Sequence, residues 1–335
     1  MKICVVRIDK MGDMLLTLPV IQGLKKNDEK NIIDVVCSDN NLKVCNNVSI
    51  INKIYLLNKK ISNIWFLIKD IRKQNYDYIF SFSPGWISII LSLFSKSKSK
   101  SLIILQSRYK NGISSKLTER ILCKIFFHNI KIVNRNLYFK KNKSISQSKL
   151  MQELVRQSGL ELLENEPINN LFQFDKKDYD QKEICLIHLS SKWINRHFSE
   201  DQFIYLLDKL KNIGKNIVMS SDQSSKKVFN KIFKKYKKIN NEDFKDLKNI
   251  DEILILEELD FDNWTSIINS SSYVITPECG CTHIASLTNC KLCVIYDTDN
   301  LPEMIAQEYA PWKKRYIKLK FGEVDFLGKL ISFTN

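Results

Sequence analysis

Three short segments of this 335-residue chain carry side chains whose types and spacing suit chemistry. The first, VRIDKMGDMLLTLP (6–19), follows an apolar run and places Asp13 after Gly12, which permits a tight turn into a helix predicted to begin at Met14. Open α/β sheets bind ligands at the carboxyl ends of their strands, so a carboxylate there suits a general base. On the local pattern alone, Asp13 serving only as a helix cap is the favoured alternative.

The second segment, HLSSKWINRHFS (188–199), leads from a strand through a loop into a helix. Its cations, Lys192 and Arg196, suit a phosphate group, because a guanidinium presents a fork of donors that matches phosphate oxygens. A basic loop residue is a weak signal by itself, and plain surface decoration is the competing interpretation.

The third segment spans 273–288, YVITPECGCTHIASLT. It predicts a strand ending at Thr276, a close turn at Gly280 and a helix capped by Thr282. The unpaired N–H groups at the start of such a helix suit a diphosphate. His283, beside this loop, either faces the core or donates to an oxyanion.

Alternating strands and helices must position these segments. Strands are predicted at 3–8, 32–37, 78–82, 184–189, 217–220, 252–256, 273–276 and 291–296, and helices at 14–26, 61–73, 86–94, 148–158 and 200–212. Residues 95–101, which alternate Ser and Lys, are expected to form an exposed loop. The alternation predicts an α/β fold with two Rossmann-like, doubly wound parallel sheets.

The length also favours two domains with separate cores. We expect an N-terminal domain over 1–165, a linker over 166–180 and a C-terminal domain over 181–335. A cleft between two such domains is a natural ligand site.

The positive charge is concentrated in one part of the chain. Of the net +15, residues 91–150 carry +13, with 14 Lys or Arg against the single acid Glu119, whereas the remainder has 38 basic and 36 acidic residues. Such a face attracts nucleic acid, anionic lipid or a phosphorylated substrate, unless it is merely a solvated lysine-rich surface.

Charges at Arg7, Asp9, Lys10 and Asp13 interrupt any leader-like apolar run, and no stretch has the length of a membrane span. Nine cysteines without a leader indicate reduced thiols, so we expect a cytoplasmic protein. A zinc site on the cysteines is the alternative that their spacing leaves open: Cys279, Cys281, Cys290 and Cys293.

Taken together, these segments resemble the lipopolysaccharide heptosyltransferases and other family 9 glycosyltransferases. Segment 6–19 is similar to the family's amino-terminal signature, and Tyr76-Asp77 lies where the family has a "YD" strand. RHFS (196–199) resembles its basic-His-Trp-Pro segment, and ECGCTH (278–283) its Asp-Ser/Thr-Gly-x-x-His signature.

The resemblance implies a GT-B glycosyltransferase that inverts the anomeric centre and needs no metal or other cofactor. Its acceptor would bind the N-terminal domain and a nucleotide sugar, most simply ADP-heptose, the C-terminal domain. Asp13 would be the catalytic base. The implied acceptor-binding residues are Lys10, Gly12, Arg108 and Arg135, and the implied donor- and phosphate-binding residues are Lys192, Arg196, Glu278, Cys279, Gly280, Thr282 and His283.

Two departures concern the donor site. Glu278 stands for the family's Asp and Cys279 for its Ser or Thr, and a thiol is a weaker phosphate donor than a hydroxyl. A different nucleotide sugar, or a member that binds without transferring, therefore remains open. D-x-D pairs at 178–180 and 297–299 resemble metal motifs that arise often by chance.

The implied acceptor is an anionic glycolipid, so the basic segment, together with the apolar residues near 86–94, predicts peripheral attachment to the inner membrane. Nucleic acid is not an expected partner, because no helix-turn-helix, RNP-like strand or zinc finger accompanies the charge.

Overall fold

The computed structural model describes most of the chain in two compact units. One unit comprises Met1–Gln173 and Gln307–Trp312, and the other comprises Phe174–Ala306 and Lys313–Asn335. The described residues are 1–58, 61–107, 117–141, 144–163, 171–174, 179, 183–196, 198–212, 214–221, 223–247, 250–257, 259–296, 302–312 and 314–334. The predicted linker at 166–180 and both D-x-D pairs lie mostly or wholly outside these ranges.

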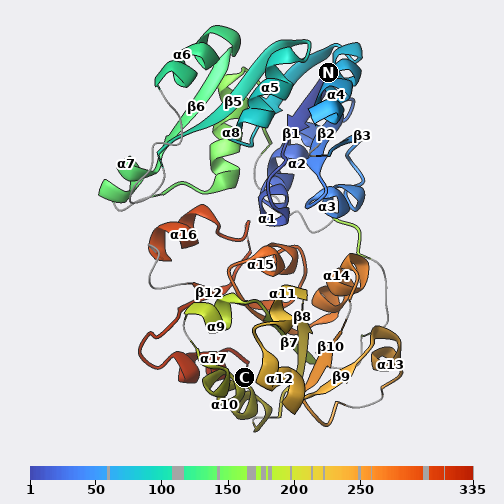
Figure 1. Cartoon of the computed structure of the whole chain (residues 1–335), viewed down its shortest axis with the longest axis vertical. Coiled ribbons are helices and arrows are strands. Elements are labelled where there is room, and N and C mark those ends of the chain that lie inside the picture. The colour runs from blue at the N-terminus through green and yellow to red at the C-terminus, as the bar shows by residue number, and fades with distance from the viewer. Residues whose placement is uncertain are drawn as a thin grey trace. The chain divides into compact units, whose positions relative to one another are not determined.

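The first unit, which we call the N-terminal unit, is built on a six-stranded parallel sheet (Figure 1). In spatial order the strands are β3 (Lys53–Leu57), β2 (Ile32–Ser38), β1 (Lys2–Val6), β4 (Tyr76–Ser81), β5 (Ser97–Ser107) and β6 (Asn129–Asn134). Its helices are α1 (Met11–Leu15), α2 (Leu18–Asn27), α3 (Leu42–Asn46), α4 (Ile61–Lys73), α5 (Trp86–Phe94), α6 (Leu117–Phe126), α7 (Arg135–Lys140) and α8 (Gln147–Gln157).

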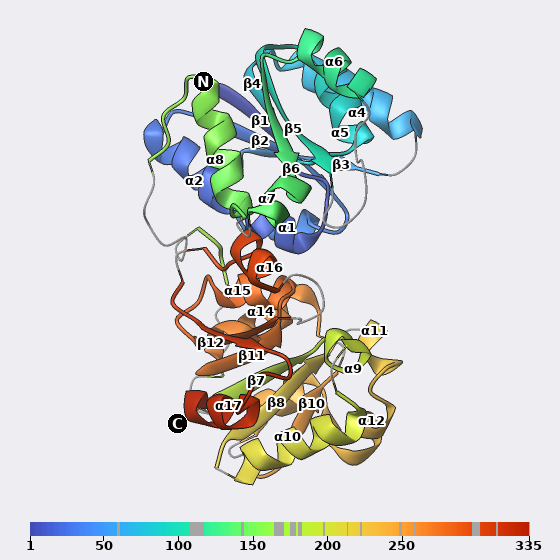
Figure 2. The ribbon, with the colours of Figure 1, turned by 90° about the vertical axis from the view of Figure 1, so that its left-hand side faces the viewer.

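Helices cover both faces of this sheet, as Figure 2 shows. Helices α2 and α8 pack together on one face, and α4, α5 and α6 lie on the other. The segment Gln307–Trp312 also belongs to this unit although it comes from the far end of the sequence. Its buried Glu308 accepts hydrogen bonds from Arg135 and from Gln147.

The second unit, which we call the C-terminal unit, has a seven-stranded parallel sheet. The spatial order is β13 (Ile317–Lys320), β12 (Lys291–Tyr296), β11 (Tyr273–Pro277), β7 (Ile184–Leu189), β8 (Asn216–Ser221), β10 (Leu254–Leu256) and β9 (Lys237–Ile239). The helices are α9 (Lys192–Arg196), α10 (Glu200–Asn212), α11 (Gln223–Lys226), α12 (Asn230–Lys235), α13 (Asn241–Asp246), α14 (Phe261–Ser270), α15 (Gly280–Ala285), α16 (Pro302–Glu308, whose end lies in the N-terminal unit) and α17 (Phe326–Thr334). The two doubly wound parallel sheets expected from the sequence are thus confirmed.

The predicted helix over 14–26 is wrong in detail, because the structure has two helices there. Helix α1 already begins at Met11, and α2 restarts at Leu18 after a break. Pro19 lies in the first turn of α2, where its missing N–H costs nothing, whereas inside one continuous helix it would leave the carbonyl of Leu15 unpaired. Asp13 therefore lies within the first turn of α1 and not before it.

The loop predicted at 95–101 is also wrong, since strand β5 begins at Ser97 and pairs with β4. The Ser–Lys alternation has the two-residue period of a strand: Lys96 and Lys98 are exposed and Ser101 is buried. A low-complexity run can therefore be a strand when a neighbouring strand satisfies its backbone. The sequence also left β3, β6, β9 and β13 unassigned.

Candidate functional site

The carboxylate of Asp13 lies just beyond the carboxyl end of β1, in the first turn of α1. Its Oδ2 accepts a hydrogen bond from the backbone N–H of Lys10 (3.2 Å), and its Oδ1 is 3.1 Å from a guanidinium nitrogen of Arg7. The Asp13 side chain is 21 % exposed. It is therefore fixed at both oxygens and still reachable from solvent, as a general base must be.

Arg7 organises this corner of the N-terminal unit. Its side chain is buried, and besides Asp13 it donates to the carbonyl of Phe82 and lies 3.4 Å from Asp9. Asp9 in turn accepts from the hydroxyl of Ser83 (2.6 Å), which follows β4. The ends of two adjacent strands are thus tied to one buried cation. The sequence analysis gave Arg7 no role, although a charge directly after an apolar strand is a signal that a buried partner is present.

In the C-terminal unit, Lys192 and Glu278 come together from separate segments. The ammonium of Lys192, the first residue of α9, donates to a carboxylate oxygen of Glu278 (2.8 Å) and to its backbone carbonyl. Both side chains are partly exposed. The structure therefore brings the second and third sequence segments together. The partly exposed ammonium of Lys192 can be reached by an anionic ligand from solvent.

The loop between β11 and α15 is held by its own side chains. The N–H of Cys279 donates to the hydroxyl of Thr282 (3.2 Å), which contacts the carbonyl of Pro277 (3.3 Å). Thr282 caps the helix from a different position than predicted: α15 begins at Gly280, Cys279 is its N-cap, and Thr282, its third residue, accepts the N–H of that N-cap. Thr282 is fully buried, so its hydroxyl is used inside the loop.

Cys279 contributes a neutral thiol to this loop. Its Sγ lies 3.3 Å from the hydroxyl of Thr276. Burial raises the pKa of the Cys279 thiol, although the bond to Thr276 and the nearby Lys192 act against burial. The raised pKa disfavours the thiolate form of Cys279 at neutral pH.

The other predicted site residues occupy varied positions. Gly12 and Gly280 lie in the first turns of α1 and α15, and neither has a positive φ. His283 is buried within α15. Arg135 pairs with Glu308, an acid that the sequence analysis did not single out.

The remaining predicted arginines are Arg108 and Arg196. Arg108 lies outside the described residues. The backbone of Arg196 ends helix α9, four residues after Lys192. Arg196 therefore belongs to the same short helix as Lys192.

The described cysteines do not form a zinc site. The described residues contain no group of three or more His, Cys, Asp or Glu side chains placed to hold a metal ion. Cys293 faces the hydrophobic core from β12, and Cys281 and Cys290 are also buried. The zinc alternative is therefore not supported.

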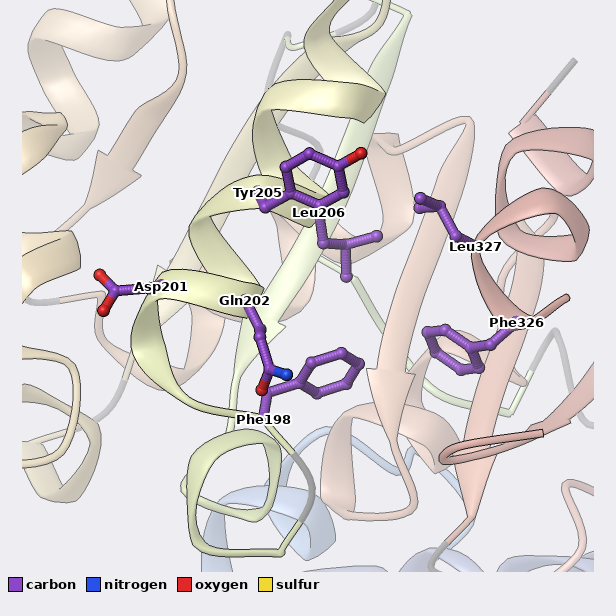
Figure 3. A pocket seen from close by; sticks show the side chains of 7 residues that line it. All are labelled: Phe198, Asp201, Gln202, Tyr205, Leu206, Phe326 and Leu327. Atoms are coloured by element: carbon purple, nitrogen blue, oxygen red, sulfur yellow. The ribbon is translucent and has the colours of Figure 1, made fainter. Parts of the chain in front are cut away.

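A separate apolar pocket of about 410 Å³ lies between α10 and the start of α17 (Figure 3). Phe198, Leu206, Phe326 and Leu327 form most of its wall. Its one charged residue, Asp201, is an acid, so the pocket has no group that would bind a diphosphate. It is distinct in chemistry from the Lys192–Glu278 site.

Comparison with known families assigns the chain to a protein family. The sequence profile of Glycosyltransferase family 9 (heptosyltransferase) matches residues 64–323. The chain belongs to glycosyltransferase family 9. The matched range includes the Lys192 and Glu278 segments, and Asp13 precedes it.

Curated relatives within this family align over part of their length. Lipopolysaccharide heptosyltransferase 3 of Escherichia coli is 39 % identical over 87 residues, which are 24 % of this chain and 26 % of the relative. The protein of the same name from strain K12 is 32 % identical over 133 residues, or 38 % of each chain. The chain thus aligns with well under two thirds of either relative.

Solved structures of the family share the fold at low identity. E. coli heptosyltransferase WaaC with ADP superposes with a TM-score of 0.73 at 12 % identity, covering 100 % of both chains. A family 9 glycosyltransferase of Veillonella parvula gives 0.71 at 14 % identity, covering 99 % of this chain and 89 % of its own. E. coli ADP-heptose LPS heptosyltransferase II has a TM-score of 0.65 at 15 % identity, covering 100 % of this chain and 98 % of its own. The GT-B fold expected from the sequence is confirmed.

Proposed function

We propose that this protein is an inverting glycosyltransferase that moves a heptose from ADP-heptose to a hydroxyl of an anionic lipopolysaccharide core acceptor. The observation that carries the proposal is the Asp13 carboxylate, oriented by the buried Arg7 at the end of β1 in a member of family 9. The ADP-bound form of WaaC supports adenosine diphosphate as the nucleotide.

Asp13 is the general base of this reaction. As the acceptor oxygen bonds to the anomeric carbon, its proton passes to Asp13 and the bond from that carbon to the diphosphate oxygen breaks. Each carboxylate oxygen makes one bond to the protein, to Arg7 or to the Lys10 N–H, and keeps a lone pair for the acceptor hydroxyl. Arg7 is a positioning residue. Lys10 and Gly12, next to Asp13, contribute to acceptor binding.

Lys192 and Arg196 offset the charge that grows on the departing nucleoside diphosphate. Both residues come from α9, and Lys192 already pairs with Glu278, which leaves its ammonium oriented toward the β11–α15 loop. Because α15 has only six residues and its N-cap N–H is used by Thr282, we assign the main electrostatic role to the cations. Cys279, Gly280 and His283 shape the loop around the donor.

The acceptor side carries the concentration of positive charge. An anionic glycolipid would be attracted to the N-terminal unit by the lysines and arginines of residues 91–150. Arg135 is committed to Glu308, so we expect it to stabilise the returning segment 307–312 rather than to bind acceptor directly. No helix among the described residues is long and apolar enough to cross a bilayer.

The first experiment is calorimetry with ADP, UDP, GDP and CMP in the presence of a chelator, on wild type, Arg196→Ala and Lys192→Ala. We expect ADP to bind best and each variant to bind about tenfold more weakly, the loss expected for one charge-assisted contact of about 1.5 kcal/mol. The matched control is Lys237→Ala, which removes another ion-paired lysine of the same unit, on β9, and should bind like wild type.

Transfer is then assayed with ADP-heptose and a deacylated core acceptor. Preference for another nucleotide would keep a transferase and replace heptose by the sugar that accompanies that nucleotide. Failure of all four nucleotides to bind would overturn the proposal in favour of a member that no longer transfers.

A further inference from the structure

Helix α6 presents its apolar residues to solvent. Its buried stripe consists of Glu119 and Cys123, continued by Phe127 beyond the helix end. The outward stripe is more hydrophobic than the buried one and contains Leu117, Ile121, Leu122, Ile125 and Phe126. Ile125 is 68 % exposed and Leu117 is 64 % exposed. A soluble surface helix normally has the opposite arrangement, so this stripe indicates a partner that is not water.

Two neighbouring helices extend this apolar face. Helix α4 exposes Trp65 and Phe66, and α5 exposes Trp86, Ile87 and Phe94. The rings of Trp65 and Phe94 lie 5.5 Å apart, which joins α4 to α5.

Helix α6 belongs to the same layer as the other two. Ile89 of α5 and Cys123 of α6 pack into one core cluster, so both helices cover the same side of the sheet (Figure 2). We call the ten exposed residues, two from α4, three from α5 and five from α6, the apolar helical face.

Cations border the apolar helical face. Lys69 and Arg72 are exposed on α4, Lys96 is exposed two residues after the end of α5, and Lys124 is exposed on α6. Arg72 donates to the carbonyl of Phe94 (3.2 Å), which holds this guanidinium at the margin of the face. Long cationic side chains beside tryptophans and aliphatic residues match the headgroup region of an anionic bilayer.

We propose that the apolar helical face is a docking surface for an anionic lipid bilayer, with the α6 stripe lying in the plane of the membrane interface. Trp65 and Trp86 would sit at headgroup level, where indole rings are favoured, and the bordering cations would pair with lipid phosphates. A second copy of this chain is disfavoured as the occupant, because two such faces would bring like charges together.

Docking deepens the proposed function, since it would hold the enzyme where a glycolipid acceptor is found. It is nevertheless tested without donor or acceptor. Failure of docking would leave the transferase proposal standing, and failure of transfer would leave docking standing.

The test uses the full chain and vesicles of phosphatidylethanolamine with phosphatidylglycerol, compared with phosphatidylcholine vesicles. The variant Ile121→Gln with Ile125→Gln removes the centre of the α6 stripe. Its matched control, Leu163→Gln with Val324→Gln, changes two exposed apolar residues elsewhere, at 58 % and 89 % exposure. We expect wild type and control to bind anionic vesicles alike and the α6 variant to bind at least tenfold more weakly.

Tryptophan fluorescence separates insertion from simple charge attraction. Trp65 and Trp86 are the most exposed indoles among the described residues, so binding should shift the emission to the blue, and Trp65→Phe with Trp86→Phe should remove the shift without abolishing binding. Equal binding by the α6 variant and its control, or no binding at low salt, would overturn the proposal. So would a lipid-free dimer that the α6 variant dissociates, because the face would then belong to a second copy.

Discussion

Two strand–loop–helix segments, one in each unit, have the same local construction and opposite consequences. After β1, Asp13 is the third residue of α1 and accepts from the N–H of Lys10; after β11, Thr282 is the third residue of α15 and accepts from the N–H of Cys279. The two bonds have the same length, 3.2 Å. Each carboxylate oxygen of Asp13 makes one bond to the protein and keeps a lone pair that solvent can reach, whereas the one oxygen of the buried Thr282 hydroxyl is used inside the loop. The same capping geometry thus presents a base in one unit and locks a loop in the other.

The cations near these two segments differ in burial. Arg7 is buried and ties together the ends of β1 and β4, while Lys192 is partly exposed and pairs with Glu278. A buried cation fixes geometry, because water does not reach the cation and cannot replace its partners. A partly exposed cation can change partners and is suited to an incoming anion.

The largest expected effect tests whether Asp13 alone is a base. Asp13→Asn keeps the shape of the side chain and removes its ability to take a proton, so kcat should fall by about 10²- to 10⁴-fold with nucleotide binding unchanged. The matched control is Asp77→Asn. Asp77 is also bound to a backbone N–H (Lys2) and a cation (Lys98), and is 23 % exposed, but it lies at the amino end of β4. A loss of kcat in both variants would mean that Asp13 is a structural cap and not the base.

The next prediction compares how much Arg7 and Lys192 each contribute to the free energy of unfolding. Arg7→Met should destabilise the protein by about 3–5 kcal/mol, because the variant leaves Asp9 and Asp13 without their buried partner. Lys192→Met should cost less than about 1 kcal/mol, because its ion pair with Glu278 is partly solvated. Urea denaturation followed by circular dichroism measures both. Equal losses would contradict the distinction between a fixing cation and an exchangeable one.

A smaller effect concerns the loop-locking role of Thr282. Thr282→Val leaves the partly buried N–H of Cys279 without its acceptor and should cost about 1–3 kcal/mol of stability. Thr282→Ser retains the hydroxyl and serves as the control. If Val and Ser destabilise equally, the lost methyl contact and not the hydrogen bond would explain the result.

The smallest effect compares two surface carboxylates as a function of pH. Hydrogen bonds from Lys318 and Lys320 hold the pKa of Glu303 below its ordinary value, and Lys98 followed by the Lys2 N–H does the same for the pKa of Asp77. A lowered folded-state pKa gives stability that is present above the ordinary pKa and is lost as pH falls through the folded-state pKa. Glu303→Gln should therefore cost less than about 1 kcal/mol at pH 7 and nothing in acid.

Salt distinguishes these two carboxylates further. High salt should remove most of the Glu303→Gln effect, because the ammonium groups of Lys318 and Lys320 that bind Glu303 are partly exposed. Part of the Asp77→Asn effect should persist, because the Lys2 backbone bond is local (2.8 Å). Thermal melts across pH and salt measure both, and an effect of Glu303→Gln that grows in acid would contradict the assigned sign.

Much of the fold was predictable from the sequence because hydrophobic periodicity is local. Strand Ile184–Leu189 and helices Ile61–Lys73, Trp86–Phe94 and Glu200–Asn212 have the predicted bounds, since each has a long apolar run or a regular stripe. Strand β5 was missed because its first half has no apolar residues, and only pairing with β4 makes it a strand. Short edge strands such as β9 likewise depend on a neighbour.

The sequence by itself determined which residue types stand at the carboxyl ends of β1, β7 and β11, and hence the kind of chemistry available there. Only the tertiary structure decided how these side chains are held. The bond from Arg7 to the Phe82 carbonyl, the pairing of Lys192 with Glu278 and the neutralisation of Arg135 by Glu308 join residues from separate segments. The physical reason is that periodicity reports burial along one element, whereas charge pairing depends on distances between elements that no local pattern encodes.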